Sequence, residues 1–589
     1  MSGPSLLAAI ALGFVGLTIR LTGGGTIDLF GLPIRANRDG RFFIAATVAL
    51  AIFLLHRRDI RRAAAAWLLN LADRRGSALA VMLSVAVGAI ALSYGTFAAG
   101  GSDSYCYLNQ AELFAAGRTH DAQLLASSAP WPDAVLTFVP PGHIPAAAGA
   151  PAVVPMCLSG YAALMAQARR VAGREAMFWV VPLLAGIGVY ATFLLGRRAM
   201  SPGVGLAAAT LLASSPAFLH QSMQPMSDVP ACTFWAITFV AAVRREHSVG
   251  TALTCGVAAS LAFLMRPNLA PLVAVVGAMV CMSRPLHLAQ SVRRGLAFAV
   301  GVAPAVVLWM LLQGLMYGGL LTSGYGNVGP LFSAAHIAPN AANYGTWLTQ
   351  TQTPVVILAI VSPLVAYRAG ARYLWWLLAF SAATVAVYLP YSVFDNWWYL
   401  RFLLPAYPPL FVLTASCVAS LLGRHGEDWR RAGLLTVTCV LAAVGVAQAK
   451  HHDVFKARDF EWRFRAIGAY VRDQLPQNAL VVTEDLGGAV RFYSGKPTLQ
   501  WKALDPLWLD RAVEWAAQQG RRTFLLFEGD EEERFRARFG AVNRIGALNW
   551  PPRLEINRTI RLYDAADLER VTLGEAYASD RVNLPPPWR

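Results

Sequence analysis

The chain has 589 residues, of which 56% are hydrophobic and only 14% are charged. A soluble globular chain carries about 25% charged residues, so this composition excludes an ordinary soluble protein and indicates that much of the surface faces lipid. The net charge of +16 does not indicate nucleic-acid binding. Most of the arginine excess lies in short clusters between apolar runs, where membrane topology places it.

Thirteen apolar runs predict membrane-spanning helices, each of which needs about 20 mostly apolar residues. The first run has no basic segment before it, which favours a retained helix over a cleaved signal peptide. Two later runs are separated only by Arg266 and Pro267 and could be half-length helices that meet within the membrane. The runs cover residues 4–20, 41–55, 78–98, 176–196, 203–219, 227–243, 250–265, 268–283, 295–315, 353–368, 373–390, 402–421 and 432–448.

Arginine clusters fall on alternate connections between these runs, and they predict which side is cytoplasmic. The loop 21–40 is an exception because it also carries arginine, but the next loop carries six arginines and outweighs it. The N-terminus is then cytoplasmic, and after thirteen crossings residues 451–589 lie outside the cytoplasm. The clusters comprise Arg57, Arg58, Arg61, Arg62, Arg74, Arg75, Arg197, Arg198, Arg244, Arg245, Arg284, Arg293, Arg294, Arg368, Arg372, Arg424, Arg430 and Arg431.

The composition changes after residue 450, where short apolar runs alternate with amphipathic ones. Strand-like runs at 479–485, 522–529 and 558–564 between helix-like segments predict a small α/β domain. This segment contains neither GxGxxG nor GxxxxGK[ST], so no nucleotide site is expected. The predicted organisation is an N-terminal transmembrane hairpin at 1–56, a membrane domain at 57–450 with a long outer loop at 99–175, and an extracytoplasmic α/β domain at 451–589.

Two aspartates lie at the predicted outer ends of helices. Asp103 follows the third apolar run, and Asp228 opens the sixth. A carboxylate at this depth could act as a general base or bind a divalent cation. Each could instead cap a helix, and Ser227-Asp228-x-Pro230 is typical of a helix start. Because both lie on the same side at similar depth, they could share a metal ion or divide a base role and an orienting role.

Two arginines lie at the same predicted depth. Arg401 is surrounded by Trp397, Trp398 and Tyr399, and Arg266 lies where an apolar run is broken. Guanidinium groups suit phosphate because they form paired hydrogen bonds, and aromatic rings suit a lipid stem or a sugar face. The alternatives are an arginine that extends toward the headgroups from an aromatic belt and a simple helix kink.

The outer loops hold further candidates for substrate binding. Tyr105 lies two residues after Asp103, His143 lies in FVPPGHIP, and Tyr325 lies in the glycine-rich tract at 317–330. Such a tract is typical of a mobile binding loop, although a passive connection could have the same composition. Cys106 and Cys157 flank one polar loop and could pair, while no CxxC or metal-type spacing is present.

Six segments occur in an order known from one enzyme superfamily. They are SDSYCYLNQAELFAAG from residue 102, VPPG at 139–142, QPMSDVPA at 224–231, LAFLMRPN at 261–268, YGGLLTSGYG at 317–326 and RFLLPAYP at 401–408. With this ordered set, over about residues 99–421, the chain resembles the GT-C glycosyltransferases. It looks like the bacterial relatives of protein O-mannosyltransferases and of the aminoarabinose transferase for lipid A.

The resemblance implies an all-α polytopic membrane domain whose active site lies on the extracytoplasmic side. It also implies a polyprenyl- or dolichyl-phosphate sugar as donor. By motif position, Asp103 would be the catalytic base, Asp228 a second acid and Arg401 the basic residue near the carrier phosphate. Residues 156–170 would lie along the membrane surface. The usual adjacent acidic pair is absent, because Asp103 is followed by Ser104, which leaves dependence on a divalent metal ion open.

These features together predict a membrane glycosyltransferase that moves a sugar from a polyprenyl-phosphate carrier to an acceptor hydroxyl, with inversion at the anomeric carbon. The expected partners are the lipid-linked donor, an acceptor glycan, lipid or protein, and membrane lipids, with no nucleic acid. The expected location is the cell (inner) membrane. A transporter or lipid flippase would instead show ionisable residues near the midplane and paired internal repeats. A structural or assembly protein that uses the α/β tail for docking is a third alternative.

Overall fold

The computed structural model describes residues 25–29, 32–36, 58–146, 151–244, 246–283, 287–366, 371–424, 427–575 and 579–583. The chain forms two compact units, Met1–Gly76 and Ser77–Arg589. In the first unit, β1 (Gly25–Leu29) and β2 (Leu32–Ala36) form an antiparallel hairpin in the predicted loop 21–40. The predicted spanning runs 4–20 and 41–55 lie outside the described residues.

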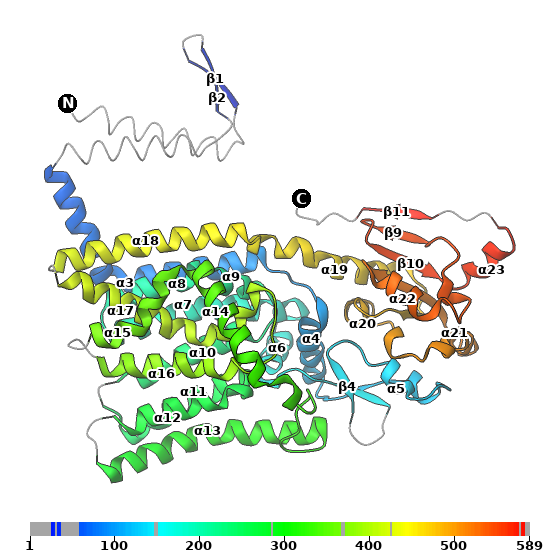
Figure 1. Ribbon diagram of the computed structural model, residues 1–589, viewed down its shortest axis with the longest axis horizontal. Helices are drawn as coiled ribbons and strands as arrows, with labels where there is room; N and C mark the ends of the chain where they lie inside the picture. Colours follow the sequence, from blue (N-terminus) through cyan, green and yellow to red (C-terminus); the bar gives the residue numbers. More distant parts are fainter. Residues whose placement is uncertain are drawn as a thin grey trace. The chain divides into compact units, whose positions relative to one another are not determined.

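The second unit contains a bundle of helices, which Figure 1 shows running side by side. Each of the other predicted runs coincides with a helix or with two helices in succession. The helices are the part of α3 (Arg58–Tyr94) from Ser77 onward, α7 (Val180–Ala199), α8 (Pro202–Ser214), α9 (Pro216–Ser222), α10 (Asp228–Ala242), α11 (Val249–Met265), α12 (Ala270–Cys281), α13 (Leu288–Tyr317), α14 (Ile337–Gln352), α15 (Leu358–Val365), α16 (Ala371–Tyr388), η8 (Trp397–Ala406), α17 (Tyr407–Gly423) and α18 (Glu427–His451).

The predicted number of thirteen spans is not confirmed. Among the described residues, five helices are long and apolar enough to cross a membrane, or up to seven if each bent pair is one span. One such pair, α8 with α9, bends by 64° at Ser215, since Pro216 lacks the N–H that would continue the helical ladder. The connection predicted at 316–351 contains α14. A bend of 118° separates the helical segment Ala334–Gln352, which includes α14, from the next one, Pro354–Val365.

Glycines let several of these helices approach each other closely. A Cβ on Gly256 of α11 would lie 2.2 Å from the carbonyl oxygen of Phe298 on α13. A Cβ on Gly301 of α13 would lie 2.6 Å from the carbonyl oxygen of Leu253. Backbone contact of this kind is a common way for membrane helices to associate, because burial of apolar surface drives little association in lipid.

Residues 99–175 form a separate small structure on the bundle, here called the outer segment. It consists of α4 (Gly101–Ala115), β3 (Asp121–Ala122), α5 (Ala134–Thr137), β4 (His143–Pro145), β5 (Ala152–Pro155) and α6 (Ser159–Ala172). The three strands form an antiparallel sheet in the order β3-β5-β4. A disulfide joins Cys106 of α4 to Cys157, with the two Cα atoms 6.0 Å apart, as the sequence had suggested.

The C-terminal domain is an α/β structure, as predicted. Its six-stranded sheet has the order β11-β9-β10-β8-β6-β7, with β6 parallel to β7 and β8. The strands are β6 (Ala479–Val482), β7 (Thr498–Leu499), β8 (Arg522–Glu528), β9 (Leu554–Ile556), β10 (Ile560–Asp564) and β11 (Asp580–Val582). The helices are α19 (Ala457–Gln474), α20 (Gly487–Ser494), α21 (Leu509–Gln518), α22 (Glu531–Phe539) and α23 (Asp567–Thr572).

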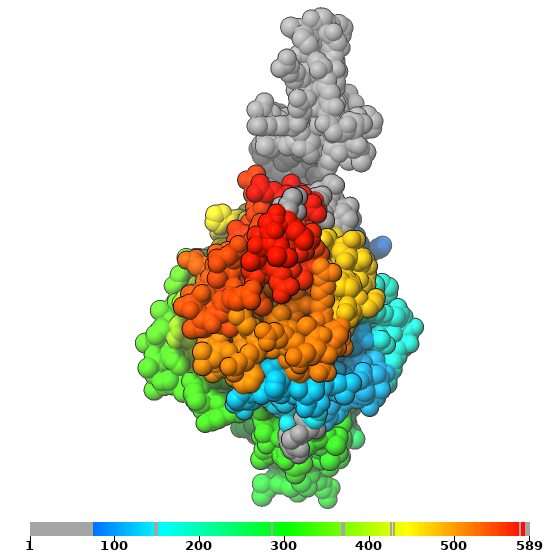
Figure 2. Space-filling view, turned by 90° about the vertical axis from the view of Figure 1, so that its right-hand side faces the viewer, coloured from blue at the N-terminus to red at the C-terminus, as the bar shows by residue number. Residues whose placement is uncertain are grey.

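The C-terminal domain packs against the outer segment through a shared aromatic core. The ring of Trp131 lies edge-on to Trp515 at 5.0 Å and stacks on Phe138 at 6.1 Å. Trp131, Phe138 and Trp515 are all buried in one cluster with the domain's own strands. In Figure 2 the orange atoms of this domain lie directly against the cyan and blue atoms of the outer segment. The two parts therefore share one core.

Candidate active site

Asp103 and Arg401 form an ion pair between α4 and η8. An Nη2 atom of Arg401 donates a hydrogen bond of 3.1 Å to Oδ2 of Asp103. The Asp103 side chain is 48% exposed and that of Arg401 is 17% exposed. Asp103 does not cap its helix, because α4 starts at Gly101 and has no side-chain cap. Its carboxylate is therefore accessible and held by one guanidinium.

Asp228 and Arg266 form a second ion pair, which is almost completely buried. The Nη2 atom of Arg266 lies 3.0 Å from Oδ1 of Asp228, and the two side chains are 9% and 1% exposed. Asp228 is the first residue of α10 but makes no capping hydrogen bond. Neither of its carboxylate oxygens has a hydrogen-bond partner in the described part of the chain. Desolvation of two charges is costly, so a buried ionisable pair at this depth indicates a functional site.

The two ion pairs belong to one cluster of charges. The guanidinium groups of Arg266 and Arg401 flank the same ring, at 5.7 and 5.2 Å from the centroid of Phe402. Arg401 also interacts electrostatically with Asp228. We call Asp103, Asp228, Arg266 and Arg401 the charge cluster. The structure thus brings together the four charged residues that the sequence singled out.

Two tyrosines border the charge cluster. Tyr325, from the loop after α13, is 44% exposed and lies within electrostatic range of Asp103, Arg266 and Arg401. Tyr107 donates a hydrogen bond of 2.8 Å to Oγ of Ser227, the residue before Asp228. Tyr107 joins α4 to the start of α10, a role that sequence reasoning missed. Its spacing of four residues from Asp103 was the available signal, since residues i and i+4 share a helix face.

Tyr105 and His143 lie away from the charge cluster. Their rings are 5.2 Å apart and both side chains are buried. Nδ1 of His143 lies 3.0 Å from the Pro141 carbonyl oxygen and Nε2 lies 2.8 Å from Nδ2 of Asn109. Nδ1 therefore carries the proton and Nε2 accepts one. Burial lowers the pKa of His143 to about 3, so this ring is neutral at pH 7 and offers phosphate no charge.

Helix geometry explains why Tyr105 does not join Asp103. Residues two apart on an α-helix point in nearly opposite directions, since successive residues turn by about 100°. Gly142 in VPPG packs on the same helix, because a Cβ there would lie 2.6 Å from the carbonyl oxygen of Ser102. Its φ of +74° also suits glycine. The VPPG motif therefore fixes the chain against the first turn of α4.

Part of the chain is similar to a known protein family. Residues 78–316 match the family model described as oligosaccharyl transferase STT3, N-terminal. A search of curated proteins gave no match. Among solved structures, ArnT from Cupriavidus metallidurans bound to undecaprenyl phosphate is 14% identical with a TM-score of 0.46, over 78% of this chain and 95% of that chain. The Archaeoglobus fulgidus oligosaccharyltransferase tethered to an acceptor peptide is 10% identical with a TM-score of 0.47, over 80% of this chain and 72% of that chain.

The family match confirms the resemblance that the ordered motifs predicted. The matched region, residues 78–316, supplies Asp103, Asp228 and Arg266, and the fourth member of the charge cluster, Arg401, follows it in the chain. The cluster is therefore completed by a helix outside the matched region.

The charge cluster fits a divalent metal ion poorly. Among the described residues, no group of three or more His, Cys, Asp and Glu side chains is arranged to hold a metal ion. The two carboxylates of the charge cluster each already pair with an arginine. A divalent cation between Asp103 and Asp228 would also lie beside two guanidinium groups. The donor set of the charge cluster therefore suits a phosphate better than a divalent cation.

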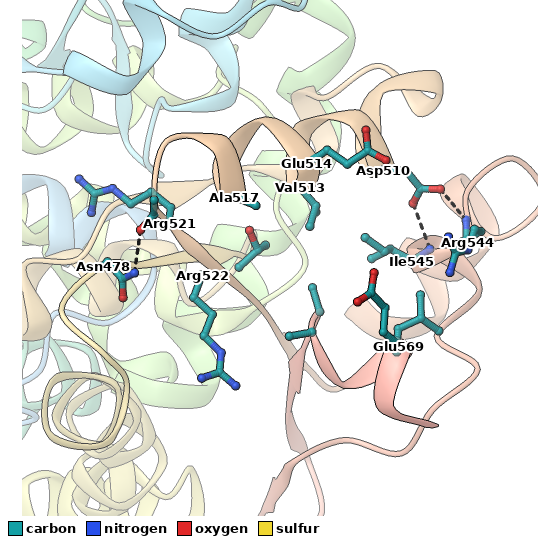
Figure 3. A pocket seen from close by; sticks show the side chains of 15 residues that line it. Asn478, Asp510, Val513, Glu514, Ala517, Arg521, Arg522, Arg544, Ile545 and Glu569 are labelled. Carbon is teal, nitrogen blue, oxygen red and sulfur yellow. Dashed lines mark hydrogen bonds between the residues drawn. The ribbon is translucent and has the colours of Figure 1, made fainter. Parts of the chain in front are cut away.

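The C-terminal domain lines two cavities that lie outside the charge cluster. One of about 640 Å³ lies behind α4 and is lined by Tyr105, Asn109 and residues of the C-terminal domain such as Arg491. Another of about 470 Å³ lies within the C-terminal domain and is lined by charged side chains from α21, β8 and α23 (Figure 3). There the Asp510 carboxylate accepts hydrogen bonds from the N–H groups of Arg544 and Ile545. That carboxylate therefore serves the domain's own structure.

His220 is a further neighbour of Arg401 that sequence reasoning missed. Its ring lies 5.3 Å from that of Trp397 and stacks on Trp398 at 6.4 Å. Gln224 lies within 3.0 Å of Nε2 of this ring. A single histidine at the outer end of an apolar run was the only signal in the sequence. Its ring extends the aromatic surroundings of η8 beyond those that were predicted.

Proposed function

We propose that this protein transfers a sugar from a polyprenyl-phosphate carrier to an acceptor hydroxyl on the extracytoplasmic side of the membrane. The observation that supports the proposal is the charge cluster, in which an accessible carboxylate lies beside two arginines. One group can accept a proton while the others bind a phosphate. The family match over residues 78–316 supports the same class of enzyme.

In the proposed reaction, Asp103 accepts the proton of the acceptor hydroxyl. The resulting oxygen attacks the anomeric carbon of the donor sugar from the side opposite the phosphate. The bond between that carbon and the phosphate oxygen breaks, and the electron pair leaves with the polyprenyl phosphate. Attack and departure on opposite faces invert the anomeric configuration. Asp103 is the group suited to the base role, because it is the half-exposed acid of the cluster.

Arg401 and Arg266 would bind the carrier phosphate and stabilise the charge that it gains. Fixed guanidinium groups in a site of low polarity are effective, because they need little reorganisation when charge develops. Arg401 would release Asp103 as it turns toward the donor phosphate, which leaves the carboxylate free to act as a base. Asp228 would keep Arg266 oriented, and Tyr325 would contact the donor from its loop. Tyr105 and His143 would support α4 without contacting the substrate.

We also infer how the chain lies in the membrane. Thirteen spans with a cytoplasmic N-terminus would place the outer segment and the C-terminal domain outside the cytoplasm, in the inner membrane of the cell. The disulfide between Cys106 and Cys157 supports this side, since disulfides persist in oxidising compartments. We infer in the same way that the domains meet at residues 56 and 450. The acceptor would be a glycan, a lipid or a protein.

The test of the proposal is a transfer assay in membranes with a labelled polyprenyl-phosphate sugar and isolated cell-envelope acceptors. Wild type is compared with Asp103→Asn and with Arg401→Ala. We expect label in the acceptor with wild type and a large loss in both variants. Equal rates in the three proteins would remove the charge cluster from the reaction. Among the described residues, no observation favours the transporter alternative.

A further inference from the structure

The C-terminal domain reaches the helix that carries Asp103. Its helix α20 lies against α4, and Gly488 of α20 touches the ring of Tyr105, two residues after Asp103. A Cβ on Gly488 would lie 2.6 Å from Cγ and 2.7 Å from Cδ1 of Tyr105. Those ring atoms are the part of the side chain nearest the backbone, so they cannot move away without moving α4. The glycine therefore sets the distance between the two helices.

Two more side chains of α20 fasten the same surface. The hydroxyl of Tyr493 accepts a hydrogen bond of 2.9 Å from the N–H of Ala99, just before α4 begins. Arg491 donates to Oε1 of Gln123 and to the carbonyl oxygen of Phe138, both at 2.8 Å, in the outer segment. Its guanidinium also bonds Thr498 of its own domain. Arg491 therefore bridges the two parts with a fork of donors.

The contact continues into the aromatic core of Trp131, Phe138 and Trp515 described above. A domain that is only tethered to its neighbour does not need a continuous, buried contact of this kind. Inter-domain contacts allow relative motion unless they are large and apolar. Here the apolar core and the hydrogen bonds of Arg491 add to the Gly488 contact. The position of α4 is consequently fixed by both the helix bundle and the C-terminal domain.

We propose that α20 is a positioning element for the catalytic helix: Gly488, with Arg491 and Tyr493, holds α4 where Asp103 meets Arg401. This inference rests on the proposed function, because it gives the C-terminal domain a part in that reaction. None of these residues touches the reacting atoms, so they are positioning residues. A displacement of about 1 Å in a reacting group can cost about 10²-fold in rate, so the contact has ample leverage.

The adjacent glycine provides a matched control. A Cβ on Gly487 would meet its nearest neighbour, Cδ of Pro141, at 3.5 Å, which is an ordinary contact. Gly487→Ala and Gly488→Ala therefore add the same methyl group to the same helix, with room at one position and none at the other. Both variants are made in the full chain and compared with wild type in nanodiscs.

The first measurement is hydrogen–deuterium exchange of α4. We expect faster exchange in residues 101–115 for Gly488→Ala and exchange equal to wild type for Gly487→Ala. Adding Tyr105→Ala should remove most of the difference between the two variants, since it removes the ring that the new methyl group meets. Equal exchange in both glycine variants would overturn the inference, and this result does not depend on knowing the substrate.

The second measurement is the transfer rate with a polyprenyl-phosphate sugar. We expect kcat to fall about tenfold or more in Gly488→Ala while KM for the donor changes little, and neither to change in Gly487→Ala. If wild type transfers sugar and Gly488→Ala does so equally well, positioning fails while the proposed function stands. If wild type transfers no sugar from any donor of this class, the proposed function fails and the exchange result alone decides the structural role. If Gly488→Ala does not fold, Arg491→Gln replaces it, because that change removes the fork without adding bulk.

Discussion

The carboxylate of Asp228 lies 3.0 Å from the guanidinium of Arg266, and both side chains are almost completely buried. Asp228 starts α10 and Arg266 directly follows the last residue of α11, so the pair joins the neighbouring ends of two helices. Substitution of one member of the pair leaves the other as a buried charge without a partner. Substitution of both members by apolar residues leaves no buried charge. Single and double variants of this pair therefore allow its effect on stability to be measured separately from its effect on activity.

Arg266→Met should lower the free energy of unfolding by about 3–5 kcal/mol, because Asp228 then remains buried and uncompensated. The double variant Arg266→Met with Asp228→Leu should recover most of this loss and still transfer no sugar. Thermal unfolding in detergent and the transfer assay give the two readouts. A double variant less stable than the single one would contradict this account of the pair.

Asp103→Asn should reduce transfer by at least about 10²-fold, since it removes the general base. Its stability should change by about 1 kcal/mol or less, because the ion pair with Arg401 is partly exposed. Glu112→Gln is the matched control on the same helix. Glu112 pairs with Arg174 outside the charge cluster, so its variant should keep the wild-type rate. A similar loss of rate in both variants would mean that acids of α4 matter for folding rather than for proton transfer.

Chelation with EDTA should leave transfer unchanged. The two carboxylates of the charge cluster are each neutralised by an arginine, and a site for a divalent cation normally offers it several unpaired oxygen ligands. The measurement is the transfer rate after dialysis against EDTA, with and without added Mg²⁺, Mn²⁺ or Zn²⁺. A rate that falls on chelation and returns with one of these ions would restore the metal site that the sequence left open.

Replacement of both Cys106 and Cys157 by alanine should lower the free energy of unfolding by about 2–4 kcal/mol, since the disulfide closes a long loop. The two residues are separated by 51 positions. The Tm of wild type should fall under reducing conditions to the Tm of the double variant. The Tm of the double variant should not change with reductant. An unchanged Tm on reduction would show that the link contributes nothing to the outer segment.

Glu531 should make the stability of the C-terminal domain depend on pH. Burial raises the pKa of this carboxyl group from 4.5 to about 7. Hydrogen bonds from the N–H groups of Trp501, Glu484 and Glu528 lower the pKa and offset part of this effect. The folded state therefore binds the proton more tightly than the unfolded chain. The free energy of unfolding should fall as pH rises from about 4.5 to about 7, by about 3 kcal/mol at most, and then level off.

Thermal unfolding of the full chain between pH 4 and pH 8, followed by tryptophan fluorescence, measures this dependence. Glu531→Gln is the comparison, since the amide keeps one carbonyl oxygen as an acceptor and does not titrate. Its Tm should vary less over the same window. A wild-type Tm that rises across this window would contradict the assignment.

Much of the fold follows from the sequence because it is local. Apolar runs of sufficient length predict helices in any membrane protein, and the helices of the described bundle other than α14 coincide with them. The alternation of short apolar and amphipathic runs likewise predicted the C-terminal sheet. The bend before Pro216 was also present in the sequence as a helix-breaking residue, but a continuous hydropathy signal across it concealed the break.

The site was predictable in its charges and not in its partners. Asp103, Asp228, Arg266 and Arg401 stand out because ionisable groups are rare at the predicted ends of apolar helices. The pairing of each acid with a particular arginine depends on how separate helices pack: α4 with η8 for Asp103, and α10 with the end of α11 for Asp228. Tyr105 and His143 appeared equally suitable, yet they face the C-terminal domain. No local pattern specifies which side of α4 another domain will cover.

The sequence by itself determined that this protein belongs in a membrane, that it carries acids and arginines at one side, and that an α/β domain follows. Composition and spacing suffice for these conclusions because each depends on hydrophobicity or on neighbours along the chain. Only the tertiary structure decided that the four charges form two ion pairs around Phe402, and that Gly488 rests on the helix of Asp103. The two ion pairs and the glycine contact each join residues on different helices, and their geometry is set by close packing of whole helices, which no local stretch of sequence encodes.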